Sequence, residues 1–382
     1  MFQSSLKNTI RTYGQYIVFG FLAFTASVVA TAQSSTDNGI DFGASYSAGY
    51  QAPPINSSAG SSHKQRLTLN MAADLEKIFG VKNGSFFFQY QNHNGQNGSD
   101  NIGDIQRFDG LDDPEYDRIH MLWYQHIFAD GKLRIKVGKV EPLSEFFYPE
   151  NAKHHLGFST TRSGTIFAQG PPSMSLNAFY SPTDKFTLAI GVYDATWNRG
   201  RDENDFRFHN PFKAEDVAIF LEGRFKWDNG IAGLPGGMKV GAWQLTAEQV
   251  RFDGGQSNGT NGIYVLVDQT LTDNGMGVYA QYGYADQQVV ALSSHIGFGM
   301  QWIGPFAERE NDIFGVGYSR VTFSDAIDAP FIKEAETAYE LFYKAPLNDW
   351  FTVQADLQAI DNPGGLGAPD VLVFTTRATI SF

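Results

Sequence analysis

The chain has 382 residues and a net charge of −13, contains no cysteine and is rich in aromatic residues, with 32 Phe and 17 Tyr. Its mean hydropathy of −0.27, with no apolar run of about 18 residues after the N-terminal region, excludes a helical membrane protein. The negative charge argues against a nucleic-acid partner. A β-barrel stays compatible with this composition, because half of each membrane-crossing strand is polar and its hydropathy signal is weak.

Residues 1–32 have the pattern of an export signal. Lys7 and Arg11 form a positive start, residues 17–29 are apolar, and an Ala-Thr-Ala cleavage motif follows. A membrane anchor is the alternative, but the apolar stretch is short and ends in that motif. Removing the two positive charges takes the net charge from −13 to −15 and leaves one expected domain, residues 33–382. The absence of cysteine fits an oxidising compartment.

Short runs of alternating apolar and polar residues recur along the rest of the chain. A strand turns successive side chains to opposite faces, and about ten residues are enough for a tilted strand to cross a membrane. Sixteen such runs are present, which predicts sixteen strands. They begin near Ile40, Lys64, Ser85, Asp117, Lys132, Met174, Phe186, Glu215, Met238, Asn261, Met276, His295, Asp312, Ala335, Trp350 and Asp370.

The connections between these runs alternate in length. Short periplasmic turns and long extracellular loops are typical of outer-membrane barrels. A soluble β-sandwich, the alternative, has no reason to separate its connections in this way. The short connections are 81–84, 129–131, 182–185, 273–275 and 346–349, and the long ones are 52–63, 92–116, 142–173, 195–214, 253–260, 286–294, 324–334 and 361–369.

Aromatic residues gather at both ends of the runs. Two aromatic belts are expected where a barrel meets the two layers of lipid headgroups, whereas ordinary core aromatics would fall more often in the middle of strands. Those beside the short turns are Phe128, Phe186, Phe225, Trp227, Trp302, Phe306, Trp350 and Phe382, and those at the opposite ends are Tyr50, Tyr90, Tyr193, Trp197, Tyr284 and Phe323.

The last run, residues 370–382, has one mostly apolar face, carries Arg377 on the other face and ends on Phe382. This pattern fits the closing strand of an outer-membrane barrel. We therefore expect an all-β, transmembrane antiparallel β-barrel of 16 strands with both termini in the periplasm. The expected partners are outer-membrane lipids, lipopolysaccharide and the barrel assembly machinery, the last through the strand that ends in Phe382.

Several stretches resemble the carbohydrate-selective (OprB-type) porins. They are residues 103–112 (Gly-Asp-Ile-Gln-Arg-Phe-Asp-Gly-Leu-Asp), 118–125 (Arg-Ile-His-Met-Leu-Trp-Tyr-Gln), 132–141, 145–152 (Glu-Phe-Phe-Tyr-Pro-Glu-Asn-Ala), 336–344, 350–358 and 362–365 (Asn-Pro-Gly-Gly). The resemblance covers nearly all of the mature chain and is strongest at 101–152 and 335–382. It implies a sixteen-stranded barrel in the bacterial outer membrane, through which mono- and disaccharides diffuse passively.

In sixteen-stranded porins the third long loop, here residues 142–173, folds into the lumen and narrows it. Alternation places Arg134 and Lys136 opposite Leu133, Ile135 and Val137, so the basic pair should face water in the lumen. A basic wall facing an acidic loop predicts a transverse field, in which a sugar forms hydrogen bonds while its C–H face rests on an aromatic ring. The alternative is that these charges only solvate a polar lumen. The expected constriction residues are Arg118, Trp123, Arg134, Lys136, Lys139, Glu141, Glu145, Phe146 and Phe147.

The remaining polar motifs indicate neither a metal site nor catalysis. His154-His155 and Asp109–Asp113 lack the ligand spacing of zinc or calcium sites, and the second segment is expected to be an external loop. No G-x-S-x-G, phosphate-binding glycine loop or H-E-x-x-H motif is present. We therefore expect a sugar channel with no cofactor. A general diffusion porin is the first alternative, and an outer-membrane hydrolase or a plugged adhesive barrel is less favoured. Further lumen candidates, expected as solvated wall, are Glu222, Arg224, Glu340, Lys344, Gln354, Asp356, Gln358 and Arg377.

Overall fold

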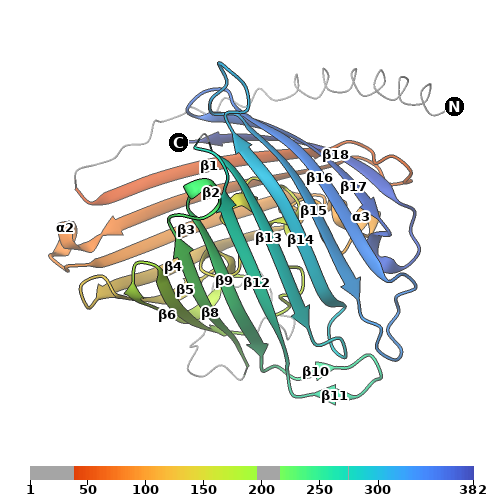
Figure 1. Cartoon of the computed structure of the whole chain (residues 1–382), viewed down its shortest axis with the longest axis horizontal. Coiled ribbons are helices and arrows are strands. Elements are labelled where there is room, and N and C mark those ends of the chain that lie inside the picture. Colours follow the sequence, from red (N-terminus) through yellow and green to blue (C-terminus); the bar gives the residue numbers. More distant parts are fainter. Residues whose placement is uncertain (1–37, 196–215, 274) are drawn as a thin grey trace. The chain divides into compact units, whose positions relative to one another are not determined.

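The computed structural model describes residues 38–195, 216–273 and 275–382. Sixteen antiparallel strands close into one barrel, in which β1 pairs with both β2 and β18 (Figure 1). The strands are β1 (Ile40–Gln51), β2 (Ser62–Asp74), β3 (Gly84–Gly95), β4 (Tyr116–Phe128), β5 (Leu133–Val140), β6 (Ser173–Thr183), β7 (Phe186–Asp194), β8 (Val217–Trp227), β9 (Gly236–Leu245), β12 (Thr260–Thr270), β13 (Met276–Ala285), β14 (Leu292–Ile303), β15 (Ile313–Phe323), β16 (Ala335–Pro346), β17 (Phe351–Asp361) and β18 (Val371–Ser381).

The predicted count of sixteen strands is confirmed. Each predicted run starts within about three residues of the first residue of a strand, because the alternation of side chains continues to the strand ends. The largest difference is at the end of β2, where a helix, α2 (Leu75–Phe79), occupies residues that the pattern assigned to the strand. Asp74 starts this helix by accepting a hydrogen bond from Glu76 N at 3.0 Å. Gly80 ends it with a φ of +71°, in the region that glycine adopts without strain.

Most connections alternate between shorter and longer along the chain, but 286–291, which falls in a connection predicted to be long, is shorter than the connection that follows it, 304–312. The long ones hold the other small elements, apart from η5 (Ile231–Gly233), which lies in the connection between β8 and β9. No helix in the described residues is long and apolar enough to cross a membrane. The predicted signal peptide (1–32), Trp197 and most of the 195–214 loop lie outside the described residues. The elements in long connections are α3 (Gly98–Ile102), η1 (Pro142–Ser144), η2 (Glu150–Ala152), α4 (Phe158–Thr161), η6 (Pro363–Gly365) and the hairpin of β10 (Gln249–Val250) with β11 (Gln256–Ser257).

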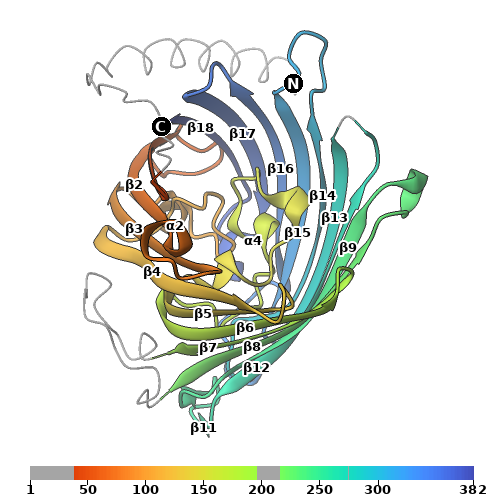
Figure 2. The same cartoon turned by 90° about the vertical axis from the view of Figure 1, so that its left-hand side faces the viewer.

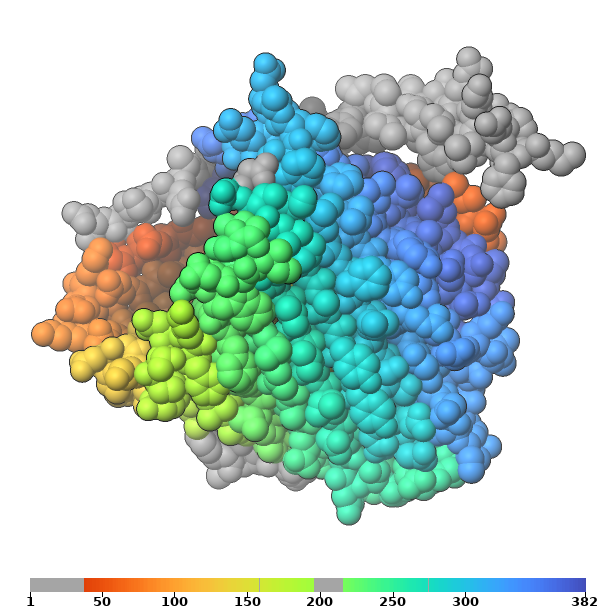
Figure 3. Space-filling model, in the orientation of Figure 1, coloured from red at the N-terminus to blue at the C-terminus, as the bar shows by residue number. Residues whose placement is uncertain are grey.

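The outer face of the barrel carries large exposed apolar side chains, such as Phe298 on β14 and Leu221 on β8. Figure 3 shows part of this face, where the green-to-blue strands form a closed outer surface. Most members of the two predicted aromatic belts that the structure describes are exposed or half-buried. Tyr193 and Phe323 are exceptions, because each is buried in a cluster of apolar side chains and therefore does not belong to a belt.

Candidate functional site

The connection between β5 and β6, residues 141–172, lies inside the ring of strands, where Figure 2 shows its helix α4. Inward carboxylates on the wall accept hydrogen bonds from the backbone of this loop. A backbone N–H that leaves water needs a partner, and an ionised carboxylate is a strong acceptor, so these acids anchor the loop. The pairs are Glu222 with Phe147 N (3.0 Å), Asp268 with Glu150 N (3.0 Å) and Asn151 N (2.8 Å), and Glu340 with Leu156 N (2.6 Å) and Gly157 N (3.3 Å).

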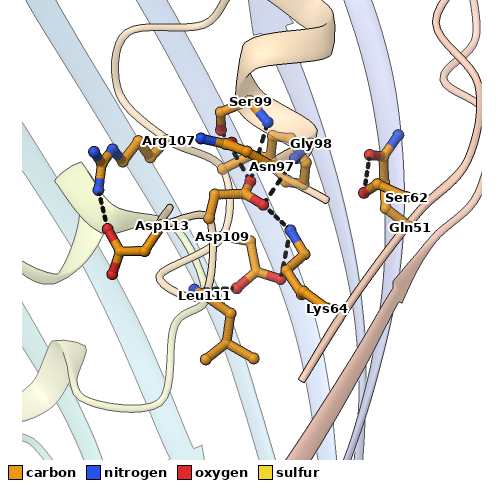
Figure 4. Close-up of polar contacts among 12 residues, drawn as sticks. Gln51, Ser62, Lys64, Asn97, Gly98, Ser99, Arg107, Asp109, Leu111 and Asp113 are labelled. Carbon is orange, nitrogen blue, oxygen red and sulfur yellow. Dashed lines mark hydrogen bonds and ion pairs between the residues drawn. The ribbon is translucent and has the colours of Figure 1, made fainter. Parts of the chain in front are cut away.

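A second loop, residues 96–115, also enters the lumen, so the prediction of an external loop at Asp109–Asp113 is wrong. Asp109 and Asp112 are buried. Lys64 of β2 forms ion pairs with both carboxylates, and Figure 4 shows its contact with Asp109. Arg377 of β18 also pairs with Asp109. The loop turns inward because two strands supply the cations that its carboxylates need once they leave water.

A cluster of charged side chains on the lumen wall lies close to the point where the 141–172 loop leaves β5. Glu145 accepts a hydrogen bond from Arg134 Nη2 at 2.8 Å and another from Lys136 Nζ. Arg134 Nη1 also donates to Gln125 Oε1 at 3.0 Å. The prediction that Arg134 and Lys136 face the lumen is therefore confirmed, since both reach a loop inside the barrel.

Two aromatic rings lie next to these charges. Lys136 Nζ is 3.8 Å from the ring centroid of Trp123, and the rings of Phe87 and Trp123 stack with centroids 5.1 Å apart. Both rings are half-buried, so part of each ring remains accessible to a solute. We call this group the wall site. It consists of Phe87, Trp123, Gln125, Arg134, Lys136 and Glu145.

The electrostatics of the wall site keep Glu145 ionised. Burial raises the pKa of this carboxyl, but the hydrogen bond from Arg134 and the positive charge of Lys136 outweigh burial, so the pKa is lowered. The side chains of Glu145 and Lys136 are 6% and 7% exposed, whereas that of Arg134 is 27% exposed. Arg134 therefore remains in contact with lumen water and has donors for a solute.

Phe146 and Phe147 do not belong to this site, although the sequence predicts them in the constriction. Both are fully buried against the neighbouring part of the wall, where Phe146 packs on Phe220 of β8 with ring centroids 5.6 Å apart. Gly191 allows this close approach, because a Cβ there would lie 2.8 Å from Phe146 Cε2. Their predicted place among the residues that line the constriction is therefore wrong, and they anchor the loop by apolar burial.

Arg118, Glu141 and Lys139 lie apart from the wall site. Arg118 is buried, with its guanidinium 3.9 Å from the ring centroid of Tyr116. Glu141 Oε2 lies 3.4 Å from Nε2 of His120. Burial raises the pKa of Glu141. The contact with His120 and the positive charges of nearby arginines have a larger, opposite effect, so the pKa is lowered to about 2. Lys139 is three residues after Lys136, so alternation places it on the opposite face of β5.

The predicted transverse field between a basic wall and an acidic loop is wrong. The contacts that anchor the loop also bring its carboxylate directly against the cations of the wall. Glu145 touches its cations directly instead of facing them across open water. Glu150 is the loop acid that stays exposed, and its carboxylate lies 3.9 Å from Lys239 Nζ. Direct pairing cancels most of the charge separation that such a field requires.

Sequence reasoning missed the contribution of Phe87 and of two lumen amides, Asn70 and Gln89, which hydrogen-bond to each other at 2.9 Å. Phe87 stands in the run Phe86–Phe88, where alternation alone does not say which rings face inward. Its ladder partner Trp123 settles the matter, because directly paired residues share a face.

The paired histidines after the loop's second short helix have separate partners. His154 Nδ1 accepts a hydrogen bond from Lys344 Nζ at 3.3 Å, while His155 Nδ1 lies 3.1 Å from Glu340 Oε2. Within the described residues, no three His, Asp or Glu side chains are grouped in a way that could hold a metal ion.

Comparison with known proteins adds to this geometry. The family described as "Carbohydrate-selective porin, OprB family" matches residues 58–382. Porin B of Pseudomonas aeruginosa is 24% identical over 361 residues, covering 81% of this chain and 79% of that protein. The high-pH structure of Pseudomonas putida OprB superposes with a TM-score of 0.81 at 20% identity, covering 91% of this chain and 95% of that chain. The OmpT outer-membrane protein of Vibrio cholerae superposes with a TM-score of 0.57 at 13% identity, covering 92% and 100%. These structural likenesses show a shared barrel fold.

Proposed function

The chain belongs to the OprB family of carbohydrate-selective porins of the bacterial outer membrane, and we propose that the wall site is where its lumen recognises sugars. The observation that carries this proposal is the half-buried ring of Trp123, which stacks with Phe87 and lies 3.8 Å from Lys136 Nζ. The wall site therefore brings aromatic rings and polar groups together at one place on the lumen wall.

The chemistry of a sugar matches this surface. A pyranose has one face of C–H groups, which packs on an aromatic ring, and a rim of hydroxyls that both donate and accept hydrogen bonds. Arg134 and Gln125, which hydrogen-bond to each other, supply polar groups on the same inner face of the wall as Trp123. No single group here is strong enough to trap a solute, and a channel needs binding that is weak enough for release.

We infer that passage involves no covalent step and no cofactor, since the proposal needs only contacts that form and break as the sugar moves. The long loops would face the exterior and the short turns the periplasm. The outward aromatic belts would contact outer-membrane lipids and lipopolysaccharide, and the strand ending in Phe382 would be read by the barrel assembly machinery.

The test is the block of single-channel conductance by graded glucose, measured for Trp123→Leu and for a matched variant, Trp302→Leu. Trp302 pairs with Phe314 and Met276 on the outer face of β14. Loss of about 60 Å² of apolar contact weakens binding by about 1.5 kcal/mol, so the half-blocking glucose concentration should rise about tenfold for Trp123→Leu alone. An equal response of the two variants would remove Trp123 from the site.

The runner-up function, general diffusion without sugar preference, is separated by a second measurement. Liposomes that contain the protein should swell faster in a neutral sugar than in a neutral amino acid of similar size. Equal swelling rates would leave the barrel as a general porin, whatever the Trp123 variant does.

A further inference from the structure

A separate pocket of about 210 Å³ lies between the 141–172 loop and the wall formed by β1, β16, β17 and β18. It shares no residue with the wall site. Its lining includes the cations Lys153, Lys344 and Arg377, together with His154 and Gln354, and several Ser and Thr hydroxyls. Among the described residues that line it there is no carboxylate, although the chain as a whole carries a net charge of −13. We call it the basic pocket.

The charges of the basic pocket are poorly neutralised, unlike other cations of the lumen wall. Arg134 and Lys136 share Glu145, and Lys64 has two aspartates. In contrast, the hydrogen bond of Lys344 goes to the uncharged His154.

His154 itself adds no positive charge at neutral pH. Burial and the positive charges of Lys344 and Lys153 lower its pKa to about 3. Its Nδ1 can therefore accept a hydrogen bond from Lys344, which fixes the ammonium group beside the pocket. Arg377 is partly neutralised by Asp109, but it also keeps a buried Nε with no hydrogen-bond acceptor.

We propose that the basic pocket binds the oxyanion of an acidic monosaccharide, a carboxylate or a phosphate group on a sugar. Lys344 and Lys153 would pair with the anion, and Gln354 and the hydroxyls would hydrogen-bond to the sugar. Pockets for drug-sized molecules start at about 300 Å³. The basic pocket, at about 210 Å³, therefore suits a smaller ligand such as a monosaccharide. Lys344 and Arg377 are partly buried, and an anion with several acceptor oxygens can form charge-assisted hydrogen bonds with them. This inference is independent of sugar recognition at the wall site.

The test compares the block of single-channel conductance by glucuronate, glucose 6-phosphate, inorganic phosphate and glucose. The proteins are the wild type, the double variant Lys153→Gln/Lys344→Gln, and the control Lys185→Gln. Lys185 is 65% exposed at a short turn, where it pairs with Asp228, so the control removes one charge outside the basic pocket.

Each lost charge weakens the attraction of an anion at about 4 Å by about 1 kcal/mol in water, a factor of about five. The half-blocking concentrations of glucuronate and glucose 6-phosphate should therefore rise at least tenfold in the double variant. They should stay unchanged in the control, and glucose block should be the same in all three proteins.

Equal half-blocking concentrations in the wild type and the double variant would overturn the proposal, as would an equal rise in the control. Inorganic phosphate that blocks as strongly as glucose 6-phosphate would overturn its sugar part. The wild type alone gives an independent check, which holds even if the double variant does not fold. Added salt should weaken block by glucuronate and leave block by glucose unchanged. Block by glucuronate that salt does not weaken would also refute the proposal.

Discussion

Replacing Glu145 by Gln should convert the wall site into a local excess of positive charge. In the wild type this carboxylate is buried and binds Arg134 and Lys136, while its backbone carbonyl accepts from Arg224. Gln keeps one acceptor oxygen and loses the charge. Each hydrogen bond to a charged group contributes about 1.5–3 kcal/mol, so we expect the loop to be less firmly anchored, by about 2–4 kcal/mol.

The electrostatic effect on ions can be estimated from Coulomb's law. One unit charge acts on an ion about 8 Å away in water with about 0.5 kcal/mol. That energy changes the local concentration of each ion by a factor of about 2.4, upward for anions and downward for cations. The anion-to-cation permeability ratio of Glu145→Gln should therefore rise about sixfold.

The assay is the reversal potential of single channels in a potassium chloride gradient. Asp228→Asn is the matched control, because Asp228 is 73% exposed at a short turn and its removal changes the net charge equally. A reversal potential in Glu145→Gln equal to that of the wild type, or shifted as much in Asp228→Asn, would refute the reasoning from Glu145.

Three further predictions follow from the anchoring contacts. Arg134→Ala with Lys136→Ala should raise the half-blocking glucose concentration about three- to tenfold, since each hydrogen bond contributes about 0.5–1.5 kcal/mol; unchanged block would remove both from the site. Phe146→Ala should destabilise the protein by about 3–5 kcal/mol and increase conductance noise as the loop loosens, whereas a quiet channel with wild-type melting would contradict its role as an anchor. Burial and the negative charge of Glu336 raise the pKa of Asp104 well above its usual value. A raised carboxyl pKa stabilises the fold at low pH, and this contribution is lost as pH rises through the folded-state pKa. Asp104→Asn should therefore reduce the fall in melting temperature between mildly acidic and mildly alkaline buffer. An unchanged dependence of melting temperature on pH would contradict this role of Asp104.

Much of the barrel follows from short-range pattern. Arg134 and Lys136 face inward because side chains alternate along β5, and that rule needs no knowledge of neighbouring strands. The same argument predicts Glu222, Glu340 and Arg377 on the inner face, and the contacts of all three with loops inside the barrel confirm it. Alternation cannot say what an inward side chain touches.

The sequence by itself determined the strands and their two faces, because both depend on neighbours a few residues apart. The resemblance to porins predicted that the 142–173 loop enters the lumen, but only the tertiary structure decided that the 96–115 loop enters as well and what holds both loops. Glu340 meets Leu156, and Arg377 meets Asp109, across separations of 184 and 268 residues. The strand register and the path of the loop also explain why Phe146 is fully buried while Trp123 is only half-buried.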